Sequence, residues 1–179
     1  MMNATAADIE TLKAAIRDVP DFPRTGIMFK DITPLLNDTA LFGLAVKLLA
    51  APYKGRGITK VIGMEARGFI FAAPVALELG AGFTPVRKKG KLPYKTVSVT
   101  YDLEYGQDTL QIHEDAIKAG EKILIVDDVL ATGGTAKGVC GLVEKLGGKV
   151  EAVAMLIELG FLKGRDRLSG YPVESLIKY

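Results

Sequence analysis

The sequence KILIVDDVLATGGTAKG, at residues 122–138, constrains the fold more than any other part of the chain, because a strand-like segment runs directly into a glycine-rich loop. Its four consecutive apolar residues, 123–126, are typical of a buried strand in a parallel sheet. The following TAKGVCGLVEKLGG has helical spacing and ends in a glycine pair. This order of strand, loop and helix predicts a βαβ unit.

The same alternation extends over most of the chain. KVIGME, FTPVRK and KVEAVAMLIEL read as further strands, RGFIFAAPVALELG as a helix, and VESLIKY as an edge strand. KTVSVTYD and DTLQIH alternate with period two around LEYGQ, which predicts an antiparallel hairpin or long flap at about 95–110. We therefore expect one doubly wound α/β domain over 1–179, with a central, mostly parallel sheet flanked by helices.

Two amphipathic helices are predicted before this alternation begins. The first covers residues 5–19 and stops at Pro20. The second starts at a cap near Asn37 or Asp38 and ends before Pro52.

Composition excludes several classes of protein. The 23 basic and 21 acidic residues leave a net charge of +2, so no broad field is present to hold nucleic acid. The single cysteine, Cys140, favours a reducing cytoplasm and is expected to be a buried residue of a helix. The N-terminus lacks the features of a secretory signal, and no apolar run is long enough to span a membrane. We expect a cytoplasmic protein without a nucleic-acid or membrane partner.

The loop ATGGT has the features of a phosphate-binding loop. Its backbone N–H groups can converge on an anion at the positive end of the next helix, while Thr132 and Thr135 add hydroxyl donors. Gly133 and Gly134 allow close approach and positive φ. The loop matches neither G-x-x-x-x-G-K-[ST] nor G-x-G-x-x-G, which argues against ATP hydrolysis and dinucleotide binding. A glycine-rich connection without a ligand is the alternative.

The whole string VDDVLATGGT resembles the phosphoribosyl-diphosphate signature of the type I phosphoribosyltransferases. The resemblance implies that Ala131, Thr132, Gly133, Gly134 and Thr135 hold the ribose 5-phosphate. It also implies that Asp127 and Asp128 lie under the ribose. Ribose hydroxyls are hydrogen-bond donors, and nearby negative charge stabilises a cationic sugar transition state.

A second strand–turn–helix junction, VIGMEARGFIFAAP, is expected at the same edge of the sheet and supplies a diphosphate site. It contains Glu65, Ala66 and Arg67, and the arginine can clamp two phosphate oxygens. In VRKKGKLPYK, Arg87 and Lys91 are candidates for neutralising the diphosphate leaving group, with Arg87 acting within its own subunit or across a subunit boundary. A surface ion pair and a solvated basic loop are the alternatives.

The irregular segment PDFPRTGIMFKDITPLL, residues 20–36, resembles the base-binding hood of the adenine phosphoribosyltransferases. EARGF, RKKGKLP, LEYG and VDDVLATGGT match the same family in order. The resemblance implies a small N-terminal hood, a flexible flap and a homodimer. It also implies that main-chain groups of Met28 and Lys30, with Phe29 between them, read the edge of adenine.

What the resemblance implies chemically is the conversion of adenine and phosphoribosyl diphosphate to AMP and diphosphate, in purine salvage. Mg²⁺ would be held mainly by the substrate, with no dedicated protein ligand, and Glu104 would manage the proton on the purine's imidazole ring. A transferase for another purine base and a non-catalytic regulator that binds the donor are the alternatives. His113, without a G-x-S-x-G elbow, is expected to be a capping or surface residue rather than part of a Ser-His-Asp triad.

Overall fold

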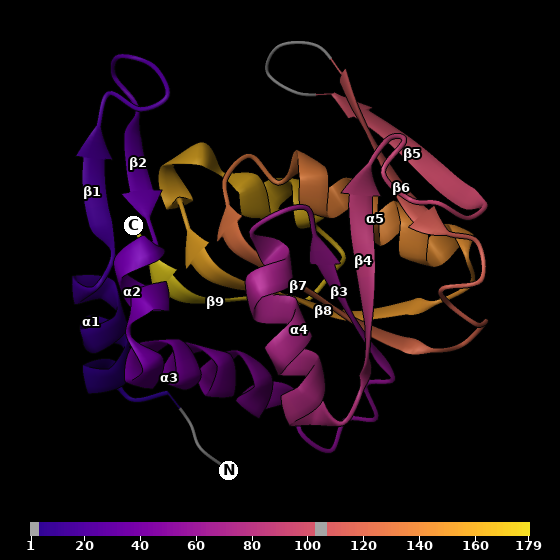
Figure 1. The fold of residues 1–179 in the computed structure, drawn as a ribbon, viewed down its shortest axis with the longest axis horizontal. Coiled ribbons are helices and arrows are strands. Elements are labelled where there is room, and N and C mark those ends of the chain that lie inside the picture. The colour runs from indigo at the N-terminus through magenta and orange to yellow at the C-terminus, as the bar shows by residue number, and fades with distance from the viewer. Residues whose placement is uncertain (1–3, 103–106) are drawn as a thin grey trace.

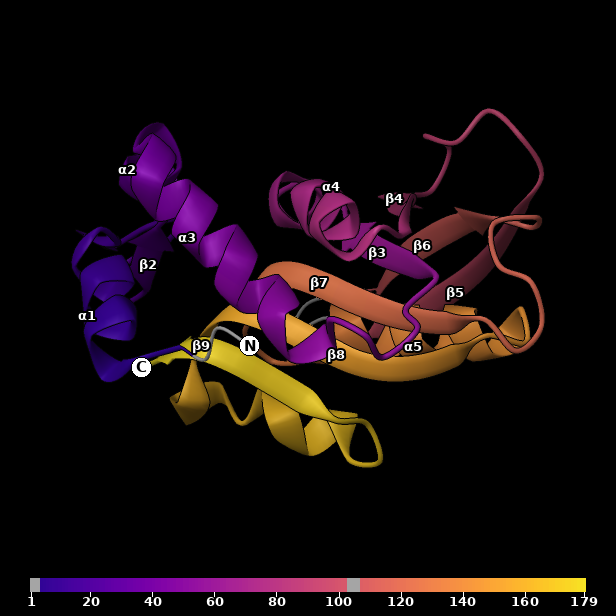
Figure 2. The ribbon, with the colours of Figure 1, turned by 90° about the horizontal axis from the view of Figure 1, so that it is seen from below.

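The computed structural model describes residues 4–102 and 107–179, which contain a central sheet with helices on both faces (Figures 1 and 2). Its strands are Lys60–Met64 (β3), Gly82–Lys88 (β4), Thr96–Asp102 (β5), Gln107–His113 (β6), Lys122–Leu130 (β7), Lys149–Glu158 (β8) and Val173–Lys178 (β9). Their spatial order is β5-β6-β4-β3-β7-β8-β9. Within this order, five neighbouring strands pair in parallel, namely β4, β3, β7, β8 and β9. This confirms the expected mostly parallel sheet.

The order of the parallel strands creates a crevice at one edge of the sheet. Numbered among themselves, these strands run 2-1-3-4-5, a doubly wound order in which the winding direction reverses between β3 and β7. Helix α4 (Gly68–Leu79) follows β3 and helix α5 (Gly134–Lys145) follows β7, on opposite faces of the sheet (Figure 2). Ligands bind at such a reversal, outside the carboxyl ends of the strands.

Apolar side chains form a core on each face of the sheet. One cluster packs α4 and the N-terminal helices against the sheet, around residues such as Leu48 and Phe71. The other packs α5 against the opposite face, around Val139 and Leu142. Cys140 is fully buried in this second cluster, as predicted, and burial raises the pKa of its thiol to about 12.

The predicted hairpin is confirmed, and it extends the sheet. Strands β5 and β6 pair in antiparallel fashion from Thr96 opposite His113 to Asp102 opposite Gln107, and β6 pairs with β4 at Arg87 and Gln111. The hairpin and the N-terminal segment rise on either side of the carboxyl edge of the sheet (Figure 1). Glu104, which follows β5 in the sequence, lies outside the described residues.

The N-terminal segment differs from its prediction. Its elements are Ala6–Ala14 (α1), Arg17–Pro20 (β1), Met28–Asp31 (β2), Thr33–Asn37 (α2) and Thr39–Ala50 (α3). The helix predicted over 5–19 is wrong beyond Ala14, because residues 17–20 form a strand that pairs with β2 in a separate two-stranded sheet. The second helix is confirmed: Asp38 caps α3 by accepting hydrogen bonds from the N–H groups of Ala40 and Leu41.

Short 3₁₀ segments complete the described elements, at Ala51–Tyr53, Gly160–Leu162 and Gly164–Leu168. Among the helices of residues 4–102 and 107–179, none has both the length and the apolar character needed to cross a bilayer.

Candidate active site

The predicted phosphate loop lies between the end of β7 and the start of α5, and its conformation depends on glycine. Gly133 caps α5 with φ +79°, and Gly134 is the first residue of the helix. A Cβ atom on Gly133 would collide with the carbonyl oxygen of Gly164, and one on Gly164 would collide with the carbonyl oxygen of Ala131. The loop therefore takes this shape only because two backbone segments approach each other without side chains.

The segment against the loop is fixed by a partly buried ion pair. Glu158, at the end of β8, is 7% exposed and accepts two hydrogen bonds from Arg165, at 2.9 Å from Nε and 2.7 Å from Nη2. Arg165 Nη1 also donates to the carbonyl oxygen of Val173. These bonds hold Gly164, the preceding residue, against the loop. Sequence reasoning missed Gly164, because no pattern marks a glycine whose contact is distant in the chain.

The loop encloses a cavity of about 80 Å³. The cavity is lined by Asp127, Val129, Leu130, Ala131, Thr132, Gly133, Thr135, Ala136 and Met155. Thr135 donates a hydrogen bond from its hydroxyl to the hydroxyl of Tyr101, 3.3 Å away on β5, so the hairpin reaches the loop. The structure thus brings Asp127 and most of the predicted 5-phosphate residues around one small space.

The two predicted ribose residues occupy the end of β7 at the crevice. Asp128 is 4% exposed, and its Oδ2 atom lies 2.8 Å from Nε of Arg67 without a hydrogen bond of good geometry. Asp127 is partly buried, and burial together with the neighbouring Asp128 carboxylate raises its pKa well above the ordinary value. A Cβ atom on Gly68 would come within 2.6 Å of Asp127 Oδ1, so this glycine makes room for the carboxylate.

Arg67 connects the phosphate side of the crevice to the N-terminal hood. Its guanidinium group lies over the ring of Phe29, 5.2 Å from the ring centre, while its Nε atom faces Asp128. The ring of Phe22 packs edge-on against Phe29 at 5.1 Å. The hood predicted over 20–36 therefore contacts the crevice through β2, although its paired strands begin at Arg17.

The other predicted adenine residues lie beside Phe29 on β2. Met28 is 47% exposed, whereas the side chain of Lys30 is engaged within the fold. Lys30 Nζ lies 2.6 Å from Asp18 Oδ1 and 3.8 Å from the ring centre of Tyr179. The Lys30 side chain is thus directed to partners within the N-terminal segment and at the C-terminus.

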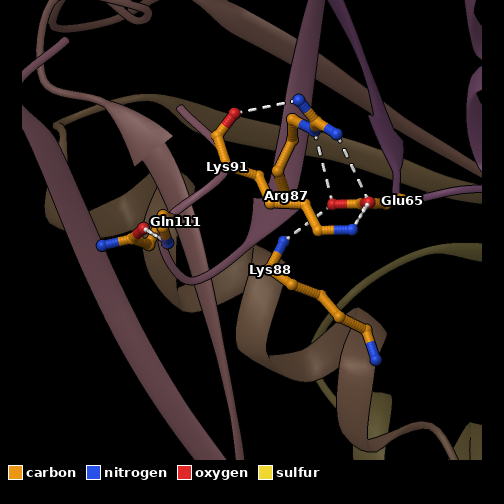
Figure 3. A network of polar contacts seen from close by, with 6 residues as sticks. Glu65, Arg87, Lys88, Lys91 and Gln111 are labelled. Carbon is orange, nitrogen blue, oxygen red and sulfur yellow. Dashed lines mark hydrogen bonds and ion pairs between the residues drawn. The ribbon is translucent and has the colours of Figure 1, made fainter. Parts of the chain in front are cut away.

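Glu65, Arg87 and Lys91 form a charged network with Lys88 (Figure 3). Glu65 Oε1 accepts a hydrogen bond from Lys91 Nζ at 2.7 Å and lies 3.4 Å from Nη2 of Arg87. Its Oε2 accepts from the backbone N–H of Lys88 at 3.1 Å and lies 3.3 Å from Nε of Arg87. These donors, Lys91 first, lower the pKa of Glu65 to about 2. Ala66 is exposed beside this network, at the turn that leads to Arg67.

His113 takes no part in this crevice chemistry. It ends β6, is half-buried and packs edge-on against the ring of Tyr94 at 5.9 Å.

Within the described residues, no group of three or more His, Cys, Asp or Glu side chains comes together as a metal site. The carboxylates nearest to the phosphate loop along the chain are those of Asp127 and Asp128, whose oxygens could bind a metal ion.

Comparison with known proteins identifies the family of this chain. Residues 37–174 match the phosphoribosyl transferase domain family. An adenine phosphoribosyltransferase of Kosmotoga olearia is 57% identical over 94% of this chain and 99% of its own. The crystal structure of the adenine phosphoribosyltransferase of Thermoanaerobacter pseudethanolicus has a TM-score of 0.93, with 52% identity over 96% of this chain and 99% of that one.

A third relative carries ligands. The crystal structure of adenine phosphoribosyltransferase from Saccharomyces cerevisiae, complexed with an imino-altritol bisphosphate and adenine, has a TM-score of 0.90. It shares 42% identity over 96% of this chain and 99% of that one. The fold, the paired acids before the glycine loop and these full-length similarities agree, and the chain therefore belongs to the phosphoribosyl transferase family and, within it, to the adenine phosphoribosyltransferases.

Proposed function

We propose that this chain transfers the phosphoribosyl group of phosphoribosyl diphosphate to nitrogen 9 of adenine, forming AMP and diphosphate in purine salvage. The observation that carries the proposal is the position of Arg67. Its guanidinium group lies between the ribose-side carboxylate of Asp128 and the hood ring of Phe29. The donor and the base would therefore meet at one crevice.

In this proposal the phosphate loop holds the 5-phosphate of the donor. Four of the five loop residues, Ala131, Thr132, Gly133 and Thr135, line the small cavity, and the N-terminus of α5 provides a positive dipole end there. Asp127 and Asp128 accept hydrogen bonds from the ribose hydroxyls and stabilise the positive charge that develops on the sugar. The raised pKa of Asp127 falls when a cation or hydroxyl donors occupy the site, because both favour the ionised carboxylate.

The diphosphate group lies on the opposite side of the crevice, near Arg67. Backbone N–H groups around Ala66 and the cations of Arg87 and Lys91 complete its binding site. Glu65, which the sequence groups with these residues, is an acceptor-only carboxylate and cannot donate to a diphosphate oxygen.

Adenine occupies the hood, where main-chain groups of Met28 and Lys30 read its edge. The 6-amino group requires an acceptor, whereas a 6-oxo group requires a donor. An unmatched pair leaves buried polar groups unsatisfied at about 1 to 3 kcal/mol each. The adenine complex of the yeast relative supports this choice of base.

Nitrogen 9 attacks the anomeric carbon with inversion as the bond to diphosphate breaks, and Glu104 takes the proton from the imidazole ring of the base. Mg²⁺ is the expected cofactor, because it binds through one or two carboxylates together with substrate phosphates. Asp127 and Asp128 provide oxygen donors that fit such an ion, whose positive charge would stabilise the leaving diphosphate.

A homodimer in the cytoplasm is the proposed form of the enzyme. Helix α4 exposes Ile70 and Leu77, which lie seven residues apart and so on one helix face, and Phe83 is also exposed at the start of β4. An exposed apolar surface of this kind is typical of a protein contact. The buried, unpaired Cys140 is consistent with a reducing compartment.

The test supplies Mg²⁺ and phosphoribosyl diphosphate with adenine, guanine, hypoxanthine or xanthine and measures the nucleotide formed. AMP from adenine alone supports the proposal. A nucleotide formed preferentially from another base would assign a different purine specificity. Donor binding without product from any base would favour a regulator.

A further inference from the structure

Glu65 is the one acid in the predicted diphosphate site, and its chemistry differs from that of its neighbours. A carboxylate and a diphosphate are both hydrogen-bond acceptors and both negative, so direct contact between them is repulsive. The Glu65 side chain is only 10% exposed, and both of its oxygens already face donors (Figure 3). The Glu65 carboxylate therefore binds the neighbouring cations of Arg87 and Lys91.

The network carries a small net charge before any ligand arrives. Arg87 and Lys91 contribute two positive charges and Glu65 one negative charge. The ammonium group of Lys88 points to a separate partner, Asp108, at 3.3 Å. A diphosphate that binds Arg87 and Lys91 must therefore share them with Glu65 or displace it.

The turn that carries these cations has anchors that do not depend on the Glu65 side chain. Arg87 Nη1 donates to the carbonyl oxygen of Lys91 at 2.9 Å. The N–H of Gly90 donates to the amide oxygen of Gln111 at 2.8 Å. The loss of the Glu65 charge therefore leaves the backbone of the turn in place, while it removes the competitor for the two cations.

We propose that Glu65 is an internal counter-ion that competes with diphosphate for Arg87 and Lys91, and so weakens the hold of the site on this leaving group and speeds its departure. The proposal deepens the diphosphate subsite and rests on the proposed function above. Glu65 acts here as a positioning residue, because it affects diphosphate only through the two cations.

The experiment compares Mg-diphosphate binding to the wild type and to Glu65→Gln, by calorimetry and by product inhibition against phosphoribosyl diphosphate. We expect the variant to bind diphosphate about three- to fivefold more tightly, which is the scale of one partly shielded ion pair. The KM for adenine is expected to stay unchanged, because the substitution lies in the diphosphate site.

A purely structural role predicts the opposite sign. If Glu65 only holds the turn together, Glu65→Gln binds diphosphate more weakly, and that result would overturn the proposal. Unchanged binding would overturn it as well. Calorimetry measures diphosphate binding without catalysis, so it tests the role of Glu65 even if the protein makes no AMP. A failure of the Glu65 proposal can therefore be distinguished from a failure of the proposed function.

Two control variants define the route of the effect. Glu114→Gln removes the same charge from an exposed carboxylate that pairs with Lys95 at 3.9 Å, and it is expected to leave diphosphate binding within about twofold of the wild type. In a Lys91→Gln background, the gain from Glu65→Gln is expected to be at least about twofold smaller, because the pair is already broken. An equal gain in both backgrounds contradicts the proposed route.

Discussion

At the scale of single residues, the phosphate loop requires glycine, because a Cβ atom at Gly133 or Gly164 would collide with the backbone. Gly133 has positive φ and lies against the carbonyl of Gly164, so Gly133→Ala combines an unfavourable backbone conformation with a backbone collision. We expect the substitution to destabilise the protein by more than about 1 kcal/mol and to abolish donor binding. Urea denaturation and calorimetry with phosphoribosyl diphosphate measure the two effects.

The matched control is Gly141→Ala, in the same helix. Gly141 has open space around its Cβ position and lies within α5. The added methyl group is expected to stabilise the helix by about 0.5–1 kcal/mol and to leave donor binding unchanged. Equal behaviour of the two variants would show that the loop does not require glycine at position 133.

Glu104 carries a chemical role that rests on sequence resemblance, because it lies outside the described residues. If this carboxylate accepts the purine proton, Glu104→Gln lowers turnover by about 10²- to 10⁴-fold while the affinity for the donor changes little. Steady-state kinetics with separate determination of donor binding measure this split. Wild-type turnover in the variant would remove Glu104 from the mechanism.

The lowered pKa of Glu65 also predicts that the free energy of unfolding depends on pH. Its pKa is about 2 in the folded protein and 4.5 ordinarily, so it contributes stability that is complete above pH 4.5 and lost as the pH falls toward about 2. The difference in unfolding free energy between the wild type and Glu65→Gln should shrink across that window as the pH falls. Urea denaturation at several pH values measures it, and a difference independent of pH would contradict the ion pairing.

At the scale of secondary-structure elements, the hood shows where local sequence patterns fail to predict the structure. Ile16 and Val19 continue the helical spacing of residues 5–14, yet Arg17–Pro20 forms strand β1. Pairing with β2, which sets Val19 opposite Phe29, satisfies the backbone of this segment instead. The partner strand lies about ten residues further along the chain, so local periodicity carries no information about it.

The hood also makes a prediction about base recognition. If main-chain groups of β2 read adenine, then Met28→Leu leaves the preference for adenine over hypoxanthine within about twofold, because the backbone is unchanged. Phe29→Ala is expected to raise the KM for adenine, since it removes the ring that packs against Arg67. Kinetics with both bases provide the measurement, and a large change in preference for Met28→Leu would assign recognition to the side chain.

At the scale of the whole molecule, the proposed dimer depends on the exposed face of α4. Leu77 is 83% exposed, so Leu77→Glu is expected to dissociate the dimer by placing a charge in an apolar contact, while the folded subunit changes by less than about 0.5 kcal/mol. Sedimentation velocity measures the dissociation. Phe161→Glu, at a 70% exposed apolar residue of another segment, is the control and should remain dimeric.

The sequence by itself determined the succession of strands and helices along the alternating region, a helix cap at Asn37 or Asp38, the hairpin and the glycine-rich loop between β7 and α5. These features follow from local spacing, turn chemistry and a specific motif. Only the tertiary structure decided that Arg67 meets both Asp128 and Phe29, and that Gly164 closes the loop at Gly133. Such contacts join segments far apart in the chain, and they depend on the packing of the whole sheet rather than on any local pattern.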